Sequence, residues 1–227
     1  EIVQGAVLSA RKTGSPPLDP SAAFDGDPKD WNLSRGQRGL AQLIKLDPDR
    51  FPGPVLTTNF DPMIGLALGE CGIRYHPLTF PLEGSLNAPI SVARDEVNIF
   101  HLHGYWRDSP TLHTPQQLEA KRNQLQKSLE QHLNQSNLVV MAYSGWDDIF
   151  TSALADCLGS DTFRGTVTWC FYGSSPAEIR DQNAALFEKF KGGIQQERIT
   201  FFHSVNCHTF FGELIADLGF DPATRSA

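Results

Sequence analysis

The chain has 227 residues and a formal net charge of -7, with 40% hydrophobic and 20% charged residues. This length and composition favour one globular domain over residues 1–227 with a sizeable buried core. The negative charge disfavours direct nucleic-acid binding, which needs clustered Lys and Arg. No run reaches the roughly twenty apolar residues of a membrane span, so we expect no insertion into a membrane.

The four cysteines are scattered along the chain without a C-x-x-C pair: Cys71, Cys157, Cys170 and Cys207. A free cysteine packs as a small hydrophobic residue, and unpaired, scattered cysteines argue against a zinc site. We therefore expect no metal site, and a reducing, cytoplasmic compartment rather than a disulfide framework.

Residues 1–30 are rich in Gly, Pro, Ser and Asp, and we expect a loop-rich lead-in with one short helix before Arg11. Because the chain begins with Glu1 rather than Met, we expect it to be truncated at its N-terminus. Several basic residues fall in the first fifty positions, among them Arg11, Lys12, Arg35, Arg38 and Arg50. They form either a local basic patch or an ordinary solvated surface, and we favour the second.

Helix and strand signals alternate from residue 31 onward. A helix from Trp31, capped by Asn32 or Ser34, precedes a strand at 55–58. Asp61 is expected as the N-cap of the next helix, with Pro62 in its first turn. The remaining expected elements are a strand at 74–80, a strand at 96–102, a helix from a capping box at Thr114 to about Gln135, a strand at 138–143, a helix at 149–158, a strand at 166–172, a helix at 176–190, a strand at 199–203 and a helix at 209–218.

This alternation predicts an α/β fold of the Rossmann-like, doubly wound type, with a mostly parallel sheet and helices on both faces. Three of the strands run into polar residues where they end, at 57–61, 101–104 and 142–148. Ligands bind at the carboxyl ends of the strands in such sheets. We therefore expect an amide, an imidazole and a hydroxyl to meet in one crevice.

Each polar strand end has a functional and a structural interpretation. Asn59 can hold a ribose hydroxyl or a water, or it marks an ordinary turn. His103 can act as a general base, or it is a hydrogen-bonded structural histidine. His101 shares a face with His103, but no third residue completes a metal site, so we expect His101 to be structural. Ser144 before Gly145 fits either an anion-binding turn or a simple helix cap.

Other nucleotide and hydrolase signatures are absent from the sequence. It contains no G-x-G-x-x-G and no Walker lysine pattern, which disfavours ordinary Rossmann oxidoreductases and P-loop enzymes. The G-x-S-x-G elbow of serine hydrolases is absent as well.

Taken in order, T-T-N-F-D at 57–61, H-x-H-G at 101–104 and A-Y-S-G-x-D-D at 142–148 resemble the sirtuin-like NAD-consuming domains. The resemblance covers roughly Pro54 to Phe211 and is to the bacterial group found in antiphage defence proteins, not to the protein deacetylases. It implies a Rossmann-like NAD+ site without a zinc module, in which nicotinamide is cleaved from ribose.

The resemblance also implies roles for individual residues. Asn59 and His103 are the expected catalytic residues, Asn59 orienting water or ribose and His103 acting as general base. The expected NAD+-binding residues are Thr58, Asp61, Ser144, Tyr143 and Gly145, with Asp61 near the nicotinamide carboxamide and Ser144 on the ribose or phosphates. Thr58 stands where sirtuins usually have Gln, but Thr fits the defence-associated group.

The implied activity is that of an NAD+ glycohydrolase releasing nicotinamide and ADP-ribose, the effector of an antiphage defence system. The glycine-rich phosphate loop of the family is missing, and Gln4 to Ser9 resembles it only weakly. Two alternatives therefore stay open: a catalytically inactive NAD+ or ADP-ribose sensor or assembly module, and, more weakly, a protein deacylase. Expected partners are further copies of the chain, or a fused or associated sensor or NTPase subunit.

Overall fold

A computed structural model describes residues 2–18, 25–79, 93, 95–107, 111–112, 123–134, 136–145 and 149–220. Its contacts divide the chain into two compact units. Unit 1 comprises residues 1–79, 89–112 and 208–227, and unit 2 comprises residues 80–88 and 113–207. No helix in these described ranges is both long enough and apolar enough to cross a bilayer. One domain over 1–227 stays a prediction.

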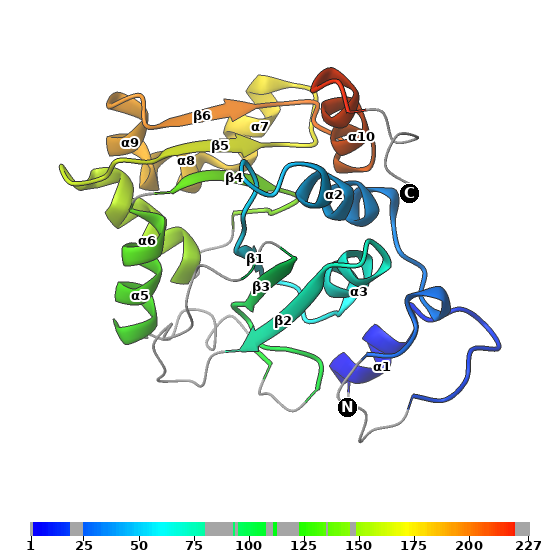
Figure 1. Ribbon diagram of the computed structural model, residues 1–227. Helices are drawn as coiled ribbons and strands as arrows, with labels where there is room; N and C mark the ends of the chain where they lie inside the picture. Colours follow the sequence, from blue (N-terminus) through cyan, green and yellow to red (C-terminus); the bar gives the residue numbers. More distant parts are fainter. Residues whose placement is uncertain are drawn as a thin grey trace. The chain divides into compact units, whose positions relative to one another are not determined.

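Unit 1 contains a parallel three-stranded sheet in the order β1-β3-β2 (Figure 1). In this register, Thr57 of β1 and Thr79 of β2 flank His101 at the end of β3. The elements of this unit are α1 (Ile2–Leu8), η1 (Pro28–Asp30), α2 (Arg35–Leu46), β1 (Val55–Thr57), α3 (Met63–Glu70), β2 (Arg74–Thr79), β3 (Glu96–His101) and, from its second residue on, α10 (Cys207–Asp217).

Helix α2 begins at Arg35, four residues later than the predicted start at Trp31. The reason is a capping box. The Ser34 hydroxyl accepts a hydrogen bond from the Gln37 backbone N–H at 3.2 Å, and the Gln37 side chain accepts one from the Ser34 N–H at 2.8 Å. This cap leaves Trp31 extended, and its side chain is fully buried in the core.

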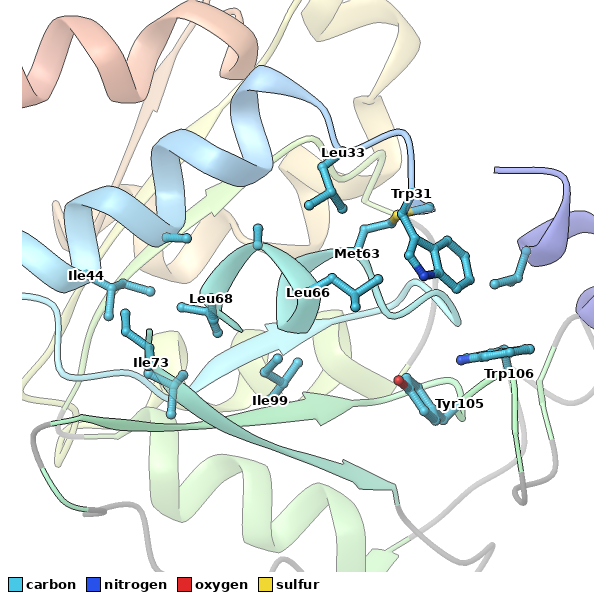
Figure 2. Packing of buried hydrophobic residues seen from close by; sticks show 14 residues of the cluster. Trp31, Leu33, Ile44, Met63, Leu66, Leu68, Ile73, Ile99, Tyr105 and Trp106 are labelled. Carbon is cyan, nitrogen blue, oxygen red and sulfur yellow. The ribbon is translucent and has the colours of Figure 1, made fainter. Parts of the chain in front are cut away.

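The core of unit 1 lies around α3, whose residues Leu66 and Leu68 are buried (Figure 2). Helix α3 packs against α2 and β2. At one end of this core lie three aromatic side chains, Trp31, Tyr105 and Trp106, all labelled in Figure 2. The two indoles meet edge to face, with their ring centroids 6.1 Å apart. Trp31, expected as the first residue of a helix, is thus a core residue in the extended segment before α2.

Unit 2 contains a second parallel sheet in the order β4-β5-β6 (Figure 1). Its elements are α5 (Asn123–Leu133), β4 (Asn137–Met141), α6 (Ile149–Gly159), β5 (Thr166–Cys170), α7 (Pro176–Gln182), α8 (Ala184–Lys189), α9 (Lys191–Gln195) and β6 (Ile199–Phe202). Strands alternate with helices and all described strand pairs are parallel, so the predicted Rossmann-like α/β class is confirmed.

One expected helix of unit 2 is interrupted in the structure, and another is described only in part. The helix predicted over 176–190 is broken at Asn183, whose side-chain N–H donates to the Ile179 carbonyl at 2.8 Å. The Ile179 carbonyl thus accepts from both the side chain and the backbone N–H of Asn183. The capping box predicted at Thr114 lies outside the described residues, so only Asn123–Leu133 of that helix is described.

An aromatic cluster fills the core of unit 2. The Trp169 side chain is fully buried, and its ring lies 5.5 Å from Phe190 and 5.8 Å from Tyr143 between centroids. Phe171 stacks on Phe201 at 6.0 Å. Such aromatic pairs add to the free energy of burying apolar surface.

The basic residues near the N-terminus are in part neutralised by acidic neighbours. Arg11 pairs with Asp30 at 3.4 Å, and Arg38 pairs with Glu70 at 2.7 Å. Arg50 pairs with an aspartate three residues before it. This pairing favours the solvated surface over a basic patch.

Candidate active site

The first two polar strand ends lie side by side in unit 1. The Leu102 N–H donates to the Thr57 carbonyl at 2.9 Å, and the Trp106 N–H donates to the Phe60 carbonyl at 2.9 Å. Strands β1 and β3 are also in parallel register up to Thr57 and His101. The loop that carries Asn59 is therefore bonded to the loop that follows β3.

Asn59 combines a fixed backbone with an exposed side chain. Its N–H donates to the Thr57 hydroxyl at 3.1 Å, and its carbonyl accepts from Nδ1 of His101 at 2.9 Å. The residue itself is exposed, while Thr58 beside it is half-buried. The carboxamide of Asn59 is thus presented to solvent from a loop that is held on both sides.

His101 is buried, with 2% of its surface exposed. Its imidazole bonds to the Asn59 carbonyl through Nδ1 and lies 4.5 Å from the Tyr105 ring between centroids. Burial lowers the pKa of His101, although the Asn59 carbonyl and the charge of Asp25 act in the opposite direction. A neutral imidazole that fixes the loop of Asn59 fits the structural role expected for His101.

His103 is also buried, with 5% of its surface exposed, two residues beyond the end of β3. Its carbonyl accepts from the Leu112 N–H at 2.8 Å. Gly104 follows with a φ of 97°, in the left-handed region that glycine adopts without strain. His103 therefore lies in a tight turn next to the loop of Asn59, within the same unit.

Asp61 is half-buried at the start of α3. Its Oδ1 accepts a hydrogen bond from the Met63 N–H at 3.0 Å. The predicted N-cap is one residue off, because the helix begins at Met63 and Pro62 occupies the cap position. Burial raises the pKa of Asp61, and the bond from Met63 partly opposes this.

The sequence interpretation missed a buried carboxylate, Asp25, with 4% of its surface exposed. Its oxygens accept hydrogen bonds from the Tyr105 hydroxyl, from Nε1 of Trp106 at 3.0 Å and from Nη2 of Arg107 at 3.0 Å. Its carbonyl also accepts from Nε1 of Trp31 at 3.0 Å. The sequence feature that could have indicated this carboxylate is the run of three hydrogen-bond donors directly after H-x-H-G, Tyr105, Trp106 and Arg107.

The third strand end follows β4 in unit 2. Ala142 and Gly145 have positive φ angles of 52° and 73°, so the chain turns sharply between them. The Tyr143 ring packs 5.6 Å from Phe150 between centroids, within its own unit, whereas Ser144 is exposed. The ring of Tyr143 is thus engaged in packing, and Ser144 is an exposed residue of this turn.

Residues Trp146, Asp147 and Asp148 of the third motif lie outside the described residues. The structure brings together the loops of Asn59 and His103, both in unit 1. That the Ser144 loop of unit 2 joins them in one crevice stays a prediction.

The described residues include no group of three His, Cys, Asp or Glu side chains arranged to hold a metal ion. All four cysteines are free thiols. The segment Gln4 to Ser9, which faintly resembles the missing phosphate loop, lies mostly within helix α1. It does not form a glycine loop at the end of a strand.

The comparison with known families agrees with the motif order. A model described as SIR2-like domain matches residues 54–191, more than half of the chain. It starts where the expected resemblance starts and ends before Phe211. A comparison with curated proteins gave no match. Domains of this family use NAD+. The chain belongs to the SIR2-like domain family.

Proposed function

We propose that the chain is an NAD+ glycohydrolase that hydrolyses the bond between nicotinamide and ribose. One observation carries the proposal: in a SIR2-like domain, the loops of Asn59 and His103 are hydrogen-bonded to each other at the carboxyl ends of adjacent parallel strands. This edge is where parallel α/β sheets bind their ligands.

The proposed residues divide the work by their chemistry. Nicotinamide leaves as a neutral amide, water adds to the ribose carbon that it leaves, and one proton is released. His103 takes that proton from water or a ribose hydroxyl as general base. The exposed carboxamide of Asn59 orients the water or the ribose, since an amide both donates and accepts hydrogen bonds.

The remaining proposed residues bind NAD+ rather than react with it. Asp61 accepts from the nicotinamide carboxamide, for which one of its oxygens is free of the Met63 bond. Thr58 lies beside Asn59 on the same loop. Ser144 and the backbone of Tyr143 and Gly145 hold the ribose or the phosphates, in keeping with the exposure of Ser144 after β4.

The biological setting is part of the same proposal. By its resemblance to the defence-associated group, the chain serves as the cytoplasmic effector of an antiphage system and depletes NAD+ during infection. It acts as a homo-oligomer or together with a sensor or NTPase subunit. Bacteria expressing the intact protein should lose NAD+ after phage challenge. If NAD+ stays constant while the protein is present, the defence role is wrong.

A second candidate function is a sensor or assembly module that binds NAD+ or ADP-ribose without cleaving NAD+. Its support is the helical state of most of Gln4 to Ser9, which does not form the family's glycine loop. Protein deacylation is a weaker candidate, because the sequence has none of the cysteine pairs that bind zinc in deacylases.

The direct test follows NAD+ loss by chromatography, using the intact protein over a range of protein concentrations. Wild type should release nicotinamide, while Asn59→Ala and His103→Ala should each be about 100-fold or more slower. His76→Ala is the matched control, because His76 lies on β2 of the same sheet with a half-exposed side chain paired to Glu96.

The outcomes separate the candidates. Activity that Asn59→Ala and His103→Ala both retain would show that the site assignment is wrong. Tight binding of ADP-ribose by calorimetry, with no turnover of NAD+ in vitro or in infected cells, would favour the binding module. Nicotinamide release that requires an acyl-lysine peptide would favour the deacylase.

A further inference from the structure

The turn of His103 is held at both ends. On its N-terminal side, the Leu102 N–H bonds to the Thr57 carbonyl at 2.9 Å. On its C-terminal side, Tyr105 and the two residues after it all donate to the carboxylate of Asp25. Only Gly104 separates His103 from Tyr105, so the hydrogen bonds to Asp25 begin directly after the turn.

The carboxylate of Asp25 is buried and accepts several hydrogen bonds. Arg107 forms an ion pair with it at 3.0 Å, with 13% of the Arg107 side chain and 6% of the Asp25 side chain exposed. The Arg107 guanidinium also lies over the Trp106 ring, 4.6 Å from its centroid. Buried, charge-assisted hydrogen bonds of this kind hold a single geometry, because breaking one leaves a buried polar group without that partner.

The same contacts reach the loop of Asn59. Tyr105, which donates to Asp25, packs its ring against His101, and His101 in turn bonds to the Asn59 carbonyl. Both candidate catalytic residues are therefore within a short series of contacts from one carboxylate. Asp25 lies 80 residues before Tyr105 in the sequence, in a segment that carries none of the three motifs.

We propose that Asp25 is a positioning residue that fixes the turn of His103, and through Tyr105 and His101 the loop of Asn59, for the cleavage of NAD+. This inference rests on the proposed function for its catalytic part. Reacting groups must be held closely, and a displacement of about 1 Å can slow a reaction roughly 100-fold. A carboxylate with a purely structural role would affect stability and leave the imidazole of His103 unchanged.

The kinetic test compares Asp25→Asn with Asp30→Asn in the intact protein. Asn has nearly the same size as Asp and keeps one acceptor oxygen, while the charge that holds Arg107 is lost. We expect kcat for NAD+ cleavage to fall about 10- to 100-fold with KM close to wild type. Asp30→Asn is the control, because the Asp30 side chain pairs with Arg11 in the same N-terminal segment. A wild-type kcat in Asp25→Asn would overturn the proposal.

A second readout does not depend on NAD+ cleavage. In histidine-labelled protein, the imidazole signals of His103 are assigned by their loss in His103→Gln and compared in wild type, Asp25→Asn and Asp30→Asn by NMR. We expect them to shift or broaden in Asp25→Asn and to match wild type in Asp30→Asn. Unchanged His103 signals in Asp25→Asn would contradict the positioning role even if wild type proved inactive towards NAD+.

A third variant separates positioning from loss of the fold. Tyr105→Phe removes one hydroxyl from Asp25 and keeps the ring against His101. If Asp25→Asn fails to fold, Tyr105→Phe should still shift the His103 signals and lower kcat, by less than the loss of the charge. Wild-type signals and kcat in Tyr105→Phe would then overturn the proposal.

Discussion

Both units contain buried tryptophan, but the indole N–H groups of the two units differ in their hydrogen bonding. In unit 1, Trp31 and Trp106 both donate from Nε1 to Asp25 at 3.0 Å. In unit 2, Nε1 of Trp169 is buried and has no hydrogen-bond partner among the described residues. Its ring is instead surrounded by aromatic neighbours, among them Phe190 at 5.5 Å.

The difference shows which kind of interaction fixes the side-chain positions in each unit. Burial of apolar surface is non-directional, and aromatic contacts allow more than one ring geometry. A buried carboxylate with several donors fixes a single arrangement, because each donor has few alternatives. The candidate catalytic residues Asn59 and His103 lie in the unit with the polar cluster. The loop of Ser144, proposed to bind, lies in the unit held by packing.

The largest effect is expected from removing the carboxylate itself. Asp25→Ala takes the shared acceptor from Tyr105, Trp106 and Arg107 and breaks a buried ion pair, which costs about 3–5 kcal/mol. Chemical denaturation measures the loss. Asp95→Ala, which breaks the exposed pair with Arg74, should cost about 1 kcal/mol or less. Equal losses of unfolding free energy in the two variants would show that the buried cluster does not stabilise the fold more than the control ion pair.

A matched pair of substitutions tests the comparison of the tryptophans. Trp106→Phe and Trp169→Phe both shrink a buried ring, but only the first removes a hydrogen bond to a carboxylate. Such bonds contribute about 1.5–3 kcal/mol, so Trp106→Phe should be more destabilising by about that amount. Urea denaturation of the two variants gives the difference directly. Losses of the same size would remove the distinction between the units.

The turn after β4 offers a smaller effect. In Gly145→Ala the new Cβ would lie 2.8 Å from Cδ2 of Leu186, at a φ of 73° that non-glycine residues rarely adopt. We expect a cost of about 1–2 kcal/mol and weaker binding of ADP-ribose, measured by denaturation and calorimetry. Gly159→Ala is the control, since nothing lies within 4 Å of its Cβ position and its φ is not positive. An unaffected Gly145→Ala would show that the turn adapts.

The smallest effect concerns pH. Because burial lowers the pKa of His101 below 6.5, the unfolded chain binds a proton more readily than the folded one as the pH falls. The contribution of neutral His101 to stability is therefore full above about pH 6.5 and is lost as the pH falls through the folded-state pKa. Unfolding free energies between about pH 8 and pH 5 should show this slope, and His101→Gln should reduce it. A slope unchanged in His101→Gln would assign it to other groups.

Much of the fold is readable from local patterns. The β-α alternation and the apolar runs into 57–61 and 101–104 predicted the parallel strands and their polar ends, because these signals lie within a few residues of each other. Ser34, one of the two predicted caps of α2, is confirmed, but the start at Trp31 was predicted too early, because the capping box makes Arg35 the first helical residue. The break at Asn183 is not visible in the apolar periodicity of residues 176–190.

The candidate site was predictable only where its residues follow strands. Asn59 and His103 follow β1 and β3, so topology alone brings their loops to one edge of the sheet. Asp25 follows none of the described strands and lies about 80 residues from the donors that it binds. No periodicity or short motif links positions so far apart, and only the folded chain shows that they meet.

The central claim is the cleavage of NAD+ by the residues of unit 1, and product balance tests it most directly. The intact protein is incubated with NAD+, and nicotinamide and ADP-ribose are quantified for wild type and His103→Gln. We predict equal molar amounts of both products from wild type, and a loss of about 100-fold or more in His103→Gln with ADP-ribose binding retained. Nicotinamide release by His103→Gln at the wild-type rate would contradict the account.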